Sequence, residues 1–173
     1  MVPITILVEN LEISCIDDNT VKSNKSQVWS PPQKDELKFN VDGSVTGDHT
    51  RAGIGGVLRN FKSESVLSFF ASVSPCKANT TELPAIHKVC VLCINSDRLI
   101  RKRIVFISDA REVVSWGNDE GLGNLKHLDL IYDIRVMLGG LGNASLIFNS
   151  RTTNSVADRL AKQDPSSYGE TIV

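Results

Sequence analysis

The chain has 173 residues, 41% of them hydrophobic, which is enough for one domain with a core of its own. Its formal net charge of −1, from 19 basic and 20 acidic residues, argues against both a generic polyanion binder and an acidic disordered protein. If the partner is nucleic acid, a metal site or a local basic patch must therefore supply the attraction.

Cysteine content and hydropathy bear on the compartment. The chain has 4 cysteines and no basic segment ahead of its apolar start, so a secretory signal is not recognisable and free thiols are expected. No apolar stretch is long enough to cross a bilayer. We expect a soluble intracellular protein, in the nucleus or the cytoplasm, with neither a membrane nor a disulfide partner.

The first strand is predicted over residues 37–42, after a lead-in without sustained periodicity over 1–28 and an extended, proline-containing segment at 29–32. Apolar and polar residues alternate along this strand, which ends in Asp42 and Gly43. An Asp before a Gly is ordinary turn chemistry, but an Asp at a strand end is also a suitable ligand for a hard cation.

Two further strands are predicted over 53–58 and 66–73, and their short connections favour an antiparallel meander. The glycines at 53, 55 and 56 resemble a dinucleotide-binding loop. They run into a strand rather than a helix, however, which is the wrong context for a phosphate cradle.

A helix is predicted from Thr80 to Ile94, where apolar residues recur at helical spacing and Thr80 or Thr81 can cap the first turn. Glu82 lies at the N-terminal end, where the helix dipole alone would explain an acid. Cys90 and Cys93 have the spacing of a redox pair or half a zinc site, but their position among apolar residues favours core packing.

The apolar run 104–107 predicts a strand covered on both faces, followed by Asp109 and a helix over 110–116. Asp109 therefore lies at the C-terminal edge of a buried strand, where open sheets flanked by helices tend to bind ligands. An N-cap role for the following helix is an equally good interpretation of this residue. The basic cluster between 98 and 103 fits a solvated connection, or else phosphate contacts.

The last elements are a helix over 125–138 ended by Gly139, a strand over 144–148 and a closing helix over 154–163. Asp158 lies in the second turn of the closing helix. Taken alone, it would be an exposed helical acid.

Four acidic motifs in this order resemble the ribonuclease H-like domains of plant genomes and retroelement reverse transcriptases. They are KFNVDGS around Asp42, TTEL around Glu82, ISDA around Asp109 and NSVADRLAK around Asp158. The resemblance covers residues 29–166 and leaves 167–173 as a tail. It implies an α/β ribonuclease H-like fold, with a five-stranded mixed sheet of three antiparallel and then two parallel strands and helices on both faces.

The resemblance also implies a metal centre. Asp42, Glu82, Asp109 and Asp158 would be the catalytic, metal-binding carboxylates, with Mg²⁺ as the cofactor and Mn²⁺ as an alternative. Two such ions can activate water, neutralise the transition state and stabilise the leaving oxygen of a phosphodiester. Four acids packed together repel one another without cations, so such a cluster is better explained as a metal site than as a source of stability.

Gly43, Ser44, Asn79 and Asn154 match family positions expected to contact nucleic acid, and the 2′-hydroxyl would distinguish RNA from DNA. Two family features are missing. Phe148 occupies the place of a histidine that assists proton transfer, and the segment 116–124 is acidic where some members carry a basic segment.

The resulting hypothesis is a monomeric, Mg²⁺-dependent endonuclease that hydrolyses the RNA strand of an RNA–DNA hybrid. One alternative is a catalytically weak or inactive, retroelement-derived module that binds nucleic acid. A second alternative is a metal-dependent exonuclease of related fold.

Overall fold

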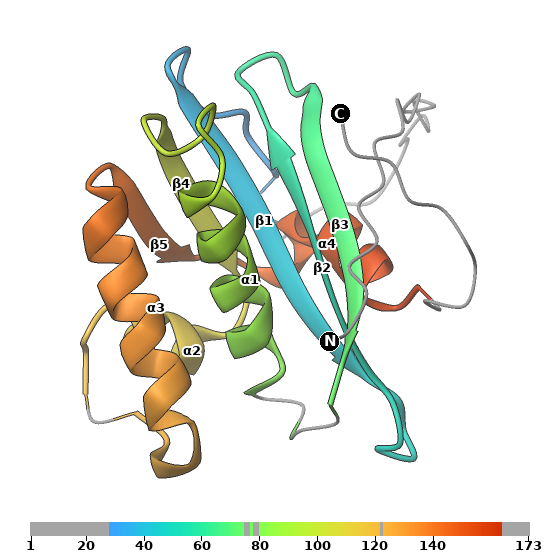
Figure 1. Cartoon of the computed structure of the whole chain (residues 1–173). Coiled ribbons are helices and arrows are strands. Elements are labelled where there is room, and N and C mark those ends of the chain that lie inside the picture. Colours follow the sequence, from blue (N-terminus) through green and yellow to red (C-terminus); the bar gives the residue numbers. More distant parts are fainter. Residues whose placement is uncertain (1–27, 75–76, 78–79, 122, 164–173) are drawn as a thin grey trace, which may run out of the picture.

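Five strands form one mixed sheet in the order β3-β2-β1-β4-β5 (Figure 1). The computed structural model describes residues 28–74, 77, 80–121 and 123–163. β1 pairs antiparallel with β2 and parallel with β4, β2 pairs antiparallel with β3, and β4 pairs parallel with β5. The sheet predicted from the sequence is confirmed. The strands are β1 Glu36–Val45, β2 Ala52–Arg59, β3 Ser65–Val73, β4 Arg103–Ser108 and β5 Ala144–Phe148.

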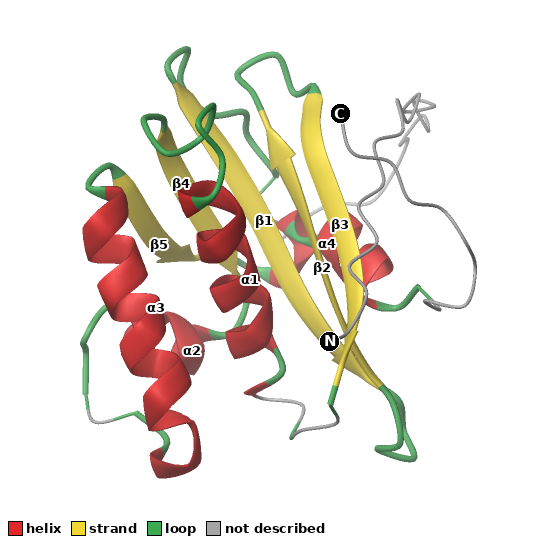
Figure 2. Ribbon diagram, viewed as in Figure 1, coloured by secondary structure: helices red, strands yellow, loops and turns green. Residues whose placement is uncertain are grey.

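Helices cover both faces of the sheet, with α1 and α3 on one face and α4 on the other (Figures 1 and 2). α2 follows β4 directly and packs against α3 and β5. The helices are α1 Glu82–Ile94, α2 Arg111–Gly117, α3 Leu128–Leu141 and α4 Ser155–Ala161, with 3₁₀ turns at Leu125–His127 and Arg151–Thr153.

The main core lies between the sheet and α1 to α3. Phe39 from the central strand packs edge-on against Phe69 with ring centroids 6.0 Å apart, and both side chains are fully buried. Cys90 and Cys93 are fully buried in the same core, which confirms their packing role. Burial raises the pKa of each thiol to about 12, so both stay protonated at neutral pH.

A smaller cluster joins Val57 and Phe70 of the sheet to Leu160 of α4. The glycines of β2 allow this helix to approach the sheet closely. A Cβ on Gly53 would lie 2.2 Å from the carbonyl oxygen of Ala161, and one on Gly55 would lie 2.4 Å from its nitrogen. The glycine run thus serves helix–sheet packing, in agreement with the rejection of a dinucleotide loop.

Two local predictions were wrong. α3 does not stop at Gly139 but continues to Leu141, because Leu141 is buried in the main core and this packing outweighs the low helix propensity of glycine. α1 has Thr81 at its N-cap position without a side-chain capping bond, and the hydroxyls of Thr80 and Thr81 donate instead to the Lys77 carbonyl.

Several predictions concern residues that the structure does not describe. These are residues 1–27 of the lead-in predicted over 1–28, which include Cys15, together with Cys76, Asn79 and everything after 163. Among the described helices, none has the length and apolar character needed to span a membrane.

Candidate metal centre

Three carboxylates from separate elements converge at one edge of the sheet. Asp42, Glu82 and Asp109 each offer an oxygen, and these oxygens all lie within 4.8 Å of one another. The parallel pairing of β1 and β4 explains part of this geometry, because Asn40 is in register with Ile107 and each strand carries its acid two residues further on. The convergence of Asp42 and Asp109 is therefore a consequence of sheet topology, whereas Glu82 comes from helix α1.

Asp42 is 3% exposed and lies on β1. Its Oδ1 accepts a 2.8 Å hydrogen bond from the Gly43 amide, while its Oδ2 is buried and accepts no hydrogen bond from the described residues. Burial, with the nearby charges of Asp109 and Asp158, raises the pKa of Asp42 to about 7. Burying a carboxylate oxygen without a hydrogen-bond donor is costly, and a bound cation would remove this cost.

Glu82 reaches the cluster from the first turn of α1. Gly43 permits this approach, because a Cβ at Gly43 would lie 2.6 Å from the backbone carbon of Thr81. Glu82 Oε2 accepts hydrogen bonds from the Ser108 hydroxyl and, at 3.2 Å, from the Ala110 amide. Burial raises the pKa of Glu82 to about 8, with further contributions from the charges of Asp109 and Asp42.

Asp109 follows β4 immediately, and its side chain is 10% exposed. The N-cap position of α2 is Ala110, and it makes no side-chain capping bond. Asp109 instead accepts a 3.4 Å hydrogen bond on Oδ1 from the Asn154 amide nitrogen, and Arg151 Nε lies 3.9 Å from its Oδ2. Of its two interpretations, the structure supports membership of the acid cluster.

Asp158 interacts with Asp42 but is not one of the three acids whose oxygens all lie within 4.8 Å of one another. Its Oδ1 lies 3.3 Å from Arg151 Nη2, and its Oδ2 accepts a 2.6 Å hydrogen bond from Lys162 Nζ. Burial opposes ionisation, but these two cations outweigh it and lower the pKa of Asp158. Asp158 is thus an ionised acid already paired with protein cations, and its role as a metal ligand remains a prediction.

The residues predicted to contact nucleic acid have different surroundings. Asn154 is 1% exposed, and its side chain bonds to Asn40, Asp109 and the Val41 carbonyl, so it positions other groups inside the protein. Gly43 serves the contact with α1 described above. Their contacts with nucleic acid stay untested, and for the Asn154 side chain we no longer propose one.

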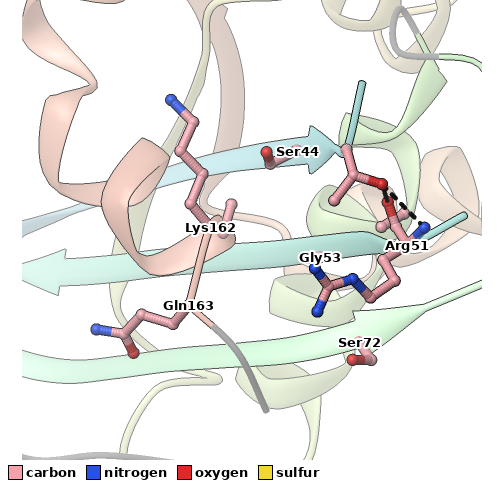
Figure 3. A pocket seen from close by; sticks show the side chains of 9 residues that line it. Ser44, Arg51, Gly53, Ser72, Lys162 and Gln163 are labelled. Carbon is pink, nitrogen blue, oxygen red and sulfur yellow. Dashed lines mark hydrogen bonds between the residues drawn. The ribbon is translucent and has the colours of Figure 1, made fainter. Parts of the chain in front are cut away.

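Ser44 is partly exposed and lines a pocket of about 200 Å³ at the ends of β1, β2 and β3 beside α4 (Figure 3). Arg51, Ser72, Lys162 and Gln163 also line it. Because Lys162 also contacts Asp158, the pocket adjoins Asp158. Ser44 is therefore placed where a bound strand could reach it, and its contact with nucleic acid stays a prediction.

A sequence comparison decides the family. The model of the family described as reverse transcriptase-like matches residues 40–164. The chain belongs to this family. Among curated proteins, none matches this member by sequence.

Solved structures share the ribonuclease H fold of this family member. The N-terminal ribonuclease H domain from Mycobacterium tuberculosis is 17% identical with a TM-score of 0.64, over 73% of this chain and 90% of that one. Ribonuclease H1 from Halobacterium salinarum is 22% identical with a TM-score of 0.63, over 73% and 94%. A ribonuclease H1 isolated from compost, in complex with an RNA/DNA hybrid, is 19% identical with a TM-score of 0.64, over 72% and 92%.

The donor set of this reverse transcriptase-like protein fits a divalent cation. It offers only carboxylate oxygens, the ligands that Mg²⁺ and Mn²⁺ prefer, and includes one buried oxygen without a donor. Burial and the neighbouring carboxylates raise the pKa values of Asp42 and Glu82, and a bound cation would offset both effects by favouring the ionised acids.

Four residues that shape this site were not predicted from the sequence: Ser108, Arg151, Lys162 and Asn40. The spacing of Lys162, four residues after Asp158 on one helix, was a readable signal for an ion pair. The contacts of Asn40 and Ser108 depend on segments distant in sequence, so no local pattern could reveal them.

Proposed function

We propose that this protein is a Mg²⁺-dependent endonuclease that hydrolyses the RNA strand of an RNA–DNA hybrid. The observation that carries the proposal is the set of three carboxylate oxygens within 4.8 Å, one buried acid having an oxygen without a donor. Membership of the reverse transcriptase-like family and a ribonuclease H fold support the same activity.

Asp42, Glu82 and Asp109 would hold the cation, and Mn²⁺ could replace Mg²⁺. A bound divalent ion would supply an activated water and neutralise charge on the phosphate. The protein's own contribution is orientation. Ser108 and the Ala110 amide fix the Glu82 carboxylate, and the Gly43 amide fixes one Asp42 oxygen. Asp158, with its two cations, would complete the site at the edge that faces solvent.

The hybrid substrate is proposed from the neighbours of this fold. The compost enzyme and a foamy viral protease–reverse transcriptase were each solved in complex with an RNA/DNA hybrid. The net charge of −1 gives little general attraction for nucleic acid, so binding should depend on the divalent ion and on local cations such as Arg151.

The test compares internally labelled RNA–DNA hybrid, duplex RNA and single-stranded DNA, each with Mg²⁺ or with EDTA. Internal cuts confined to the RNA of the hybrid, only with Mg²⁺, are expected. Asp42→Asn should abolish cleavage, while Asp129→Asn, which changes an exposed acid in the first turn of α3, should not. Stepwise loss of nucleotides from one end would indicate an exonuclease in place of the proposed endonuclease. A cleaving Asp42→Asn variant would refute the proposed metal site.

A second candidate function is Mg²⁺-dependent nucleic-acid binding with slow or absent turnover. The observation that favours it is Phe148, at the end of β5, where the resemblance places a histidine. Its ring lies 4.0 Å from the Arg111 guanidinium and offers no proton donor. The acidic segment 116–124 also contains no Lys or Arg. The neighbouring Arg135 of α3 pairs with Asp119 at 2.6 Å and donates to the Trp116 carbonyl. Binding to hybrid without cuts in the same assay would select this function.

A further inference from the structure

We propose that Trp29 is a positioning residue for Asp109, acting through the side-chain amides of Asn40 and Asn154. Trp29 lies before the segment that the family model matches, which begins at residue 40. The inference rests on the proposed metal site. It goes beyond that site by giving a role in it to a segment that precedes the sheet.

A continuous line of hydrogen bonds joins the two residues. Trp29 Nε1 donates to Asn40 Oδ1 at 3.1 Å, Asn40 Nδ2 donates to Asn154 Oδ1 at 3.1 Å, and Asn154 Nδ2 donates to Asp109 Oδ1 at 3.4 Å. Asn40 and Asn154 are each 1% exposed, so water cannot replace a lost partner readily. These hydrogen bonds connect the indole of Trp29, which precedes β1, to a carboxylate of the acid cluster.

The indole N–H of Trp29 fixes the donor-to-acceptor direction of this series of hydrogen bonds. An indole N–H can only donate, so Asn40 must turn its oxygen toward Trp29 and its NH₂ toward Asn154. Asn154 then presents its oxygen to Asn40 and its NH₂ to Asp109. Reversing either amide would set acceptor against acceptor or donor against donor.

Two backbone carbonyls favour the same orientation. Thr153 accepts from Asn40 Nδ2 at 3.4 Å, and Val41 accepts from Asn154 Nδ2 at 2.7 Å. The direction of both amides is therefore determined at each step, and a donor always reaches Asp109. This hydrogen bond to Oδ1 restricts rotation of a carboxylate that the metal centre needs in one orientation.

The indole itself is held in place. The Arg59 guanidinium lies 5.0 Å from its ring centroid and the Lys38 ammonium 5.8 Å, while Lys38 also donates a 2.6 Å hydrogen bond to the Ser30 carbonyl. The substitution Trp29→Phe would leave an aromatic ring for these cation–π contacts but remove the N–H donor. Trp29→Phe is therefore a specific probe of the hydrogen bond.

The first experiment measures Mg²⁺ affinity of the full chain by titration calorimetry. Trp29→Phe should weaken binding about threefold to tenfold, the equivalent of one hydrogen bond. Trp116→Phe, at the other tryptophan, should leave the affinity unchanged. Wild-type affinity in a Trp29→Phe variant with an unchanged circular dichroism spectrum would overturn the proposal.

A double-mutant cycle separates positioning from general structural support. In an Asp109→Asn background, Trp29→Phe should cause no further loss of Mg²⁺ affinity, because its effect passes through the Asp109 carboxylate. An equal loss in both backgrounds would mean that Trp29 supports the fold and does not position Asp109.

A metal-free measurement keeps the inference independent of cleavage and of the folding of the Trp29 variant. In nuclear magnetic resonance spectra of the protein in EDTA, Asp109→Asn should shift the Trp29 indole N–H signal, and Asp129→Asn should not. An unmoved Trp29 signal would overturn the proposal. A moved signal in a protein that cuts no substrate would refute the nuclease function alone.

Discussion

Lys162 Nζ donates a 2.6 Å hydrogen bond to Oδ2 of Asp158, one helical turn earlier. A divalent ion that used this oxygen would have to compete with the ammonium group. We predict that Lys162→Met raises divalent-ion affinity by up to about fivefold, since a partly exposed ion pair contributes about 0.2–1 kcal/mol. Calorimetric titration with Mn²⁺ measures this change. Lys126→Met, which removes the same charge from a distant turn, is the control, and an equal gain there would indicate a general effect of net charge.

The stability of the metal-free protein should fall as pH rises. The pKa of Asp42 is raised from 3.8 to about 7 and that of Glu82 from 4.5 to about 8, so the folded state binds these protons more tightly than the unfolded state. Their stabilising contribution is complete below about pH 4 and is lost as the pH rises through about 7 for Asp42 and about 8 for Glu82. Asp42→Asn should therefore gain melting temperature relative to wild type between pH 5 and pH 8 in EDTA. A constant difference across this range would contradict the buried, protonated state of Asp42.

Metal binding should release protons near neutral pH. Asp42 and Glu82 must be ionised to bind a cation, and burial raises the pKa of each, to about 7 and about 8. We predict that Mg²⁺ affinity increases from pH 6 to pH 8. Calorimetry at pH 7 in buffers of different ionisation enthalpy should show protons leaving the protein. Affinity independent of pH over this range would show that the two acids are ionised before the cation arrives.

Gly43→Ala should destabilise the protein by about 1–3 kcal/mol, the range typical of overpacking. The new Cβ would lie 2.6 Å from both the backbone carbon and the carbonyl oxygen of Thr81, so β1 and the start of α1 would have to separate. Gly47→Ala is the matched control, because nothing lies within 4 Å of its added Cβ. Chemical denaturation measures both variants, and equal stability of the two would show that β1 and α1 are not in close contact at Gly43.

Phe148→His tests whether the aromatic residue limits turnover. The side chain is 36% exposed at the end of β5, in register with Ser108, the residue before Asp109. A histidine there would add a titratable group close to the acid cluster, and we predict a higher single-turnover rate of hybrid cleavage with unchanged hybrid affinity. Phe148→Leu is the control without a titratable group. A rate equal to that of Phe148→Leu would show that the missing histidine is not what limits cleavage.

The sequence predicted the sheet well because its strands carry strong local signals. Alternation along 37–42 and the continuous apolar run at 104–107 each lie inside an observed strand, and the strand 144–148 was predicted to the residue. The end of α3 was predicted wrongly because Gly139 is a poor helix former, whereas burial of Leu141, which depends on the rest of the fold, decides the outcome.

The members of the acid cluster could be predicted from the sequence, but the contacts around them could not. The sequence motifs around Asp42, Glu82 and Asp109 identified these acids, and the structure places their oxygens within 4.8 Å of one another. The ion pairs of Asp158 depend on where Arg151 and Lys162 lie around it. Asn154 was predicted to contact nucleic acid because the sequence does not reveal its burial against β1. These properties arise from contacts between distant segments.

The parallel pairing of β1 with β4 has a kinetic consequence. Asp42 lies on β1 and Asp109 follows β4, and two strands and a helix separate β1 from β4 along the sequence. The oxygens of the two acids therefore cannot meet until this long-range pairing has formed. A divalent ion would then find its complete ligand set only in the nearly native chain. It should slow unfolding of the protein while leaving the refolding rate almost unchanged.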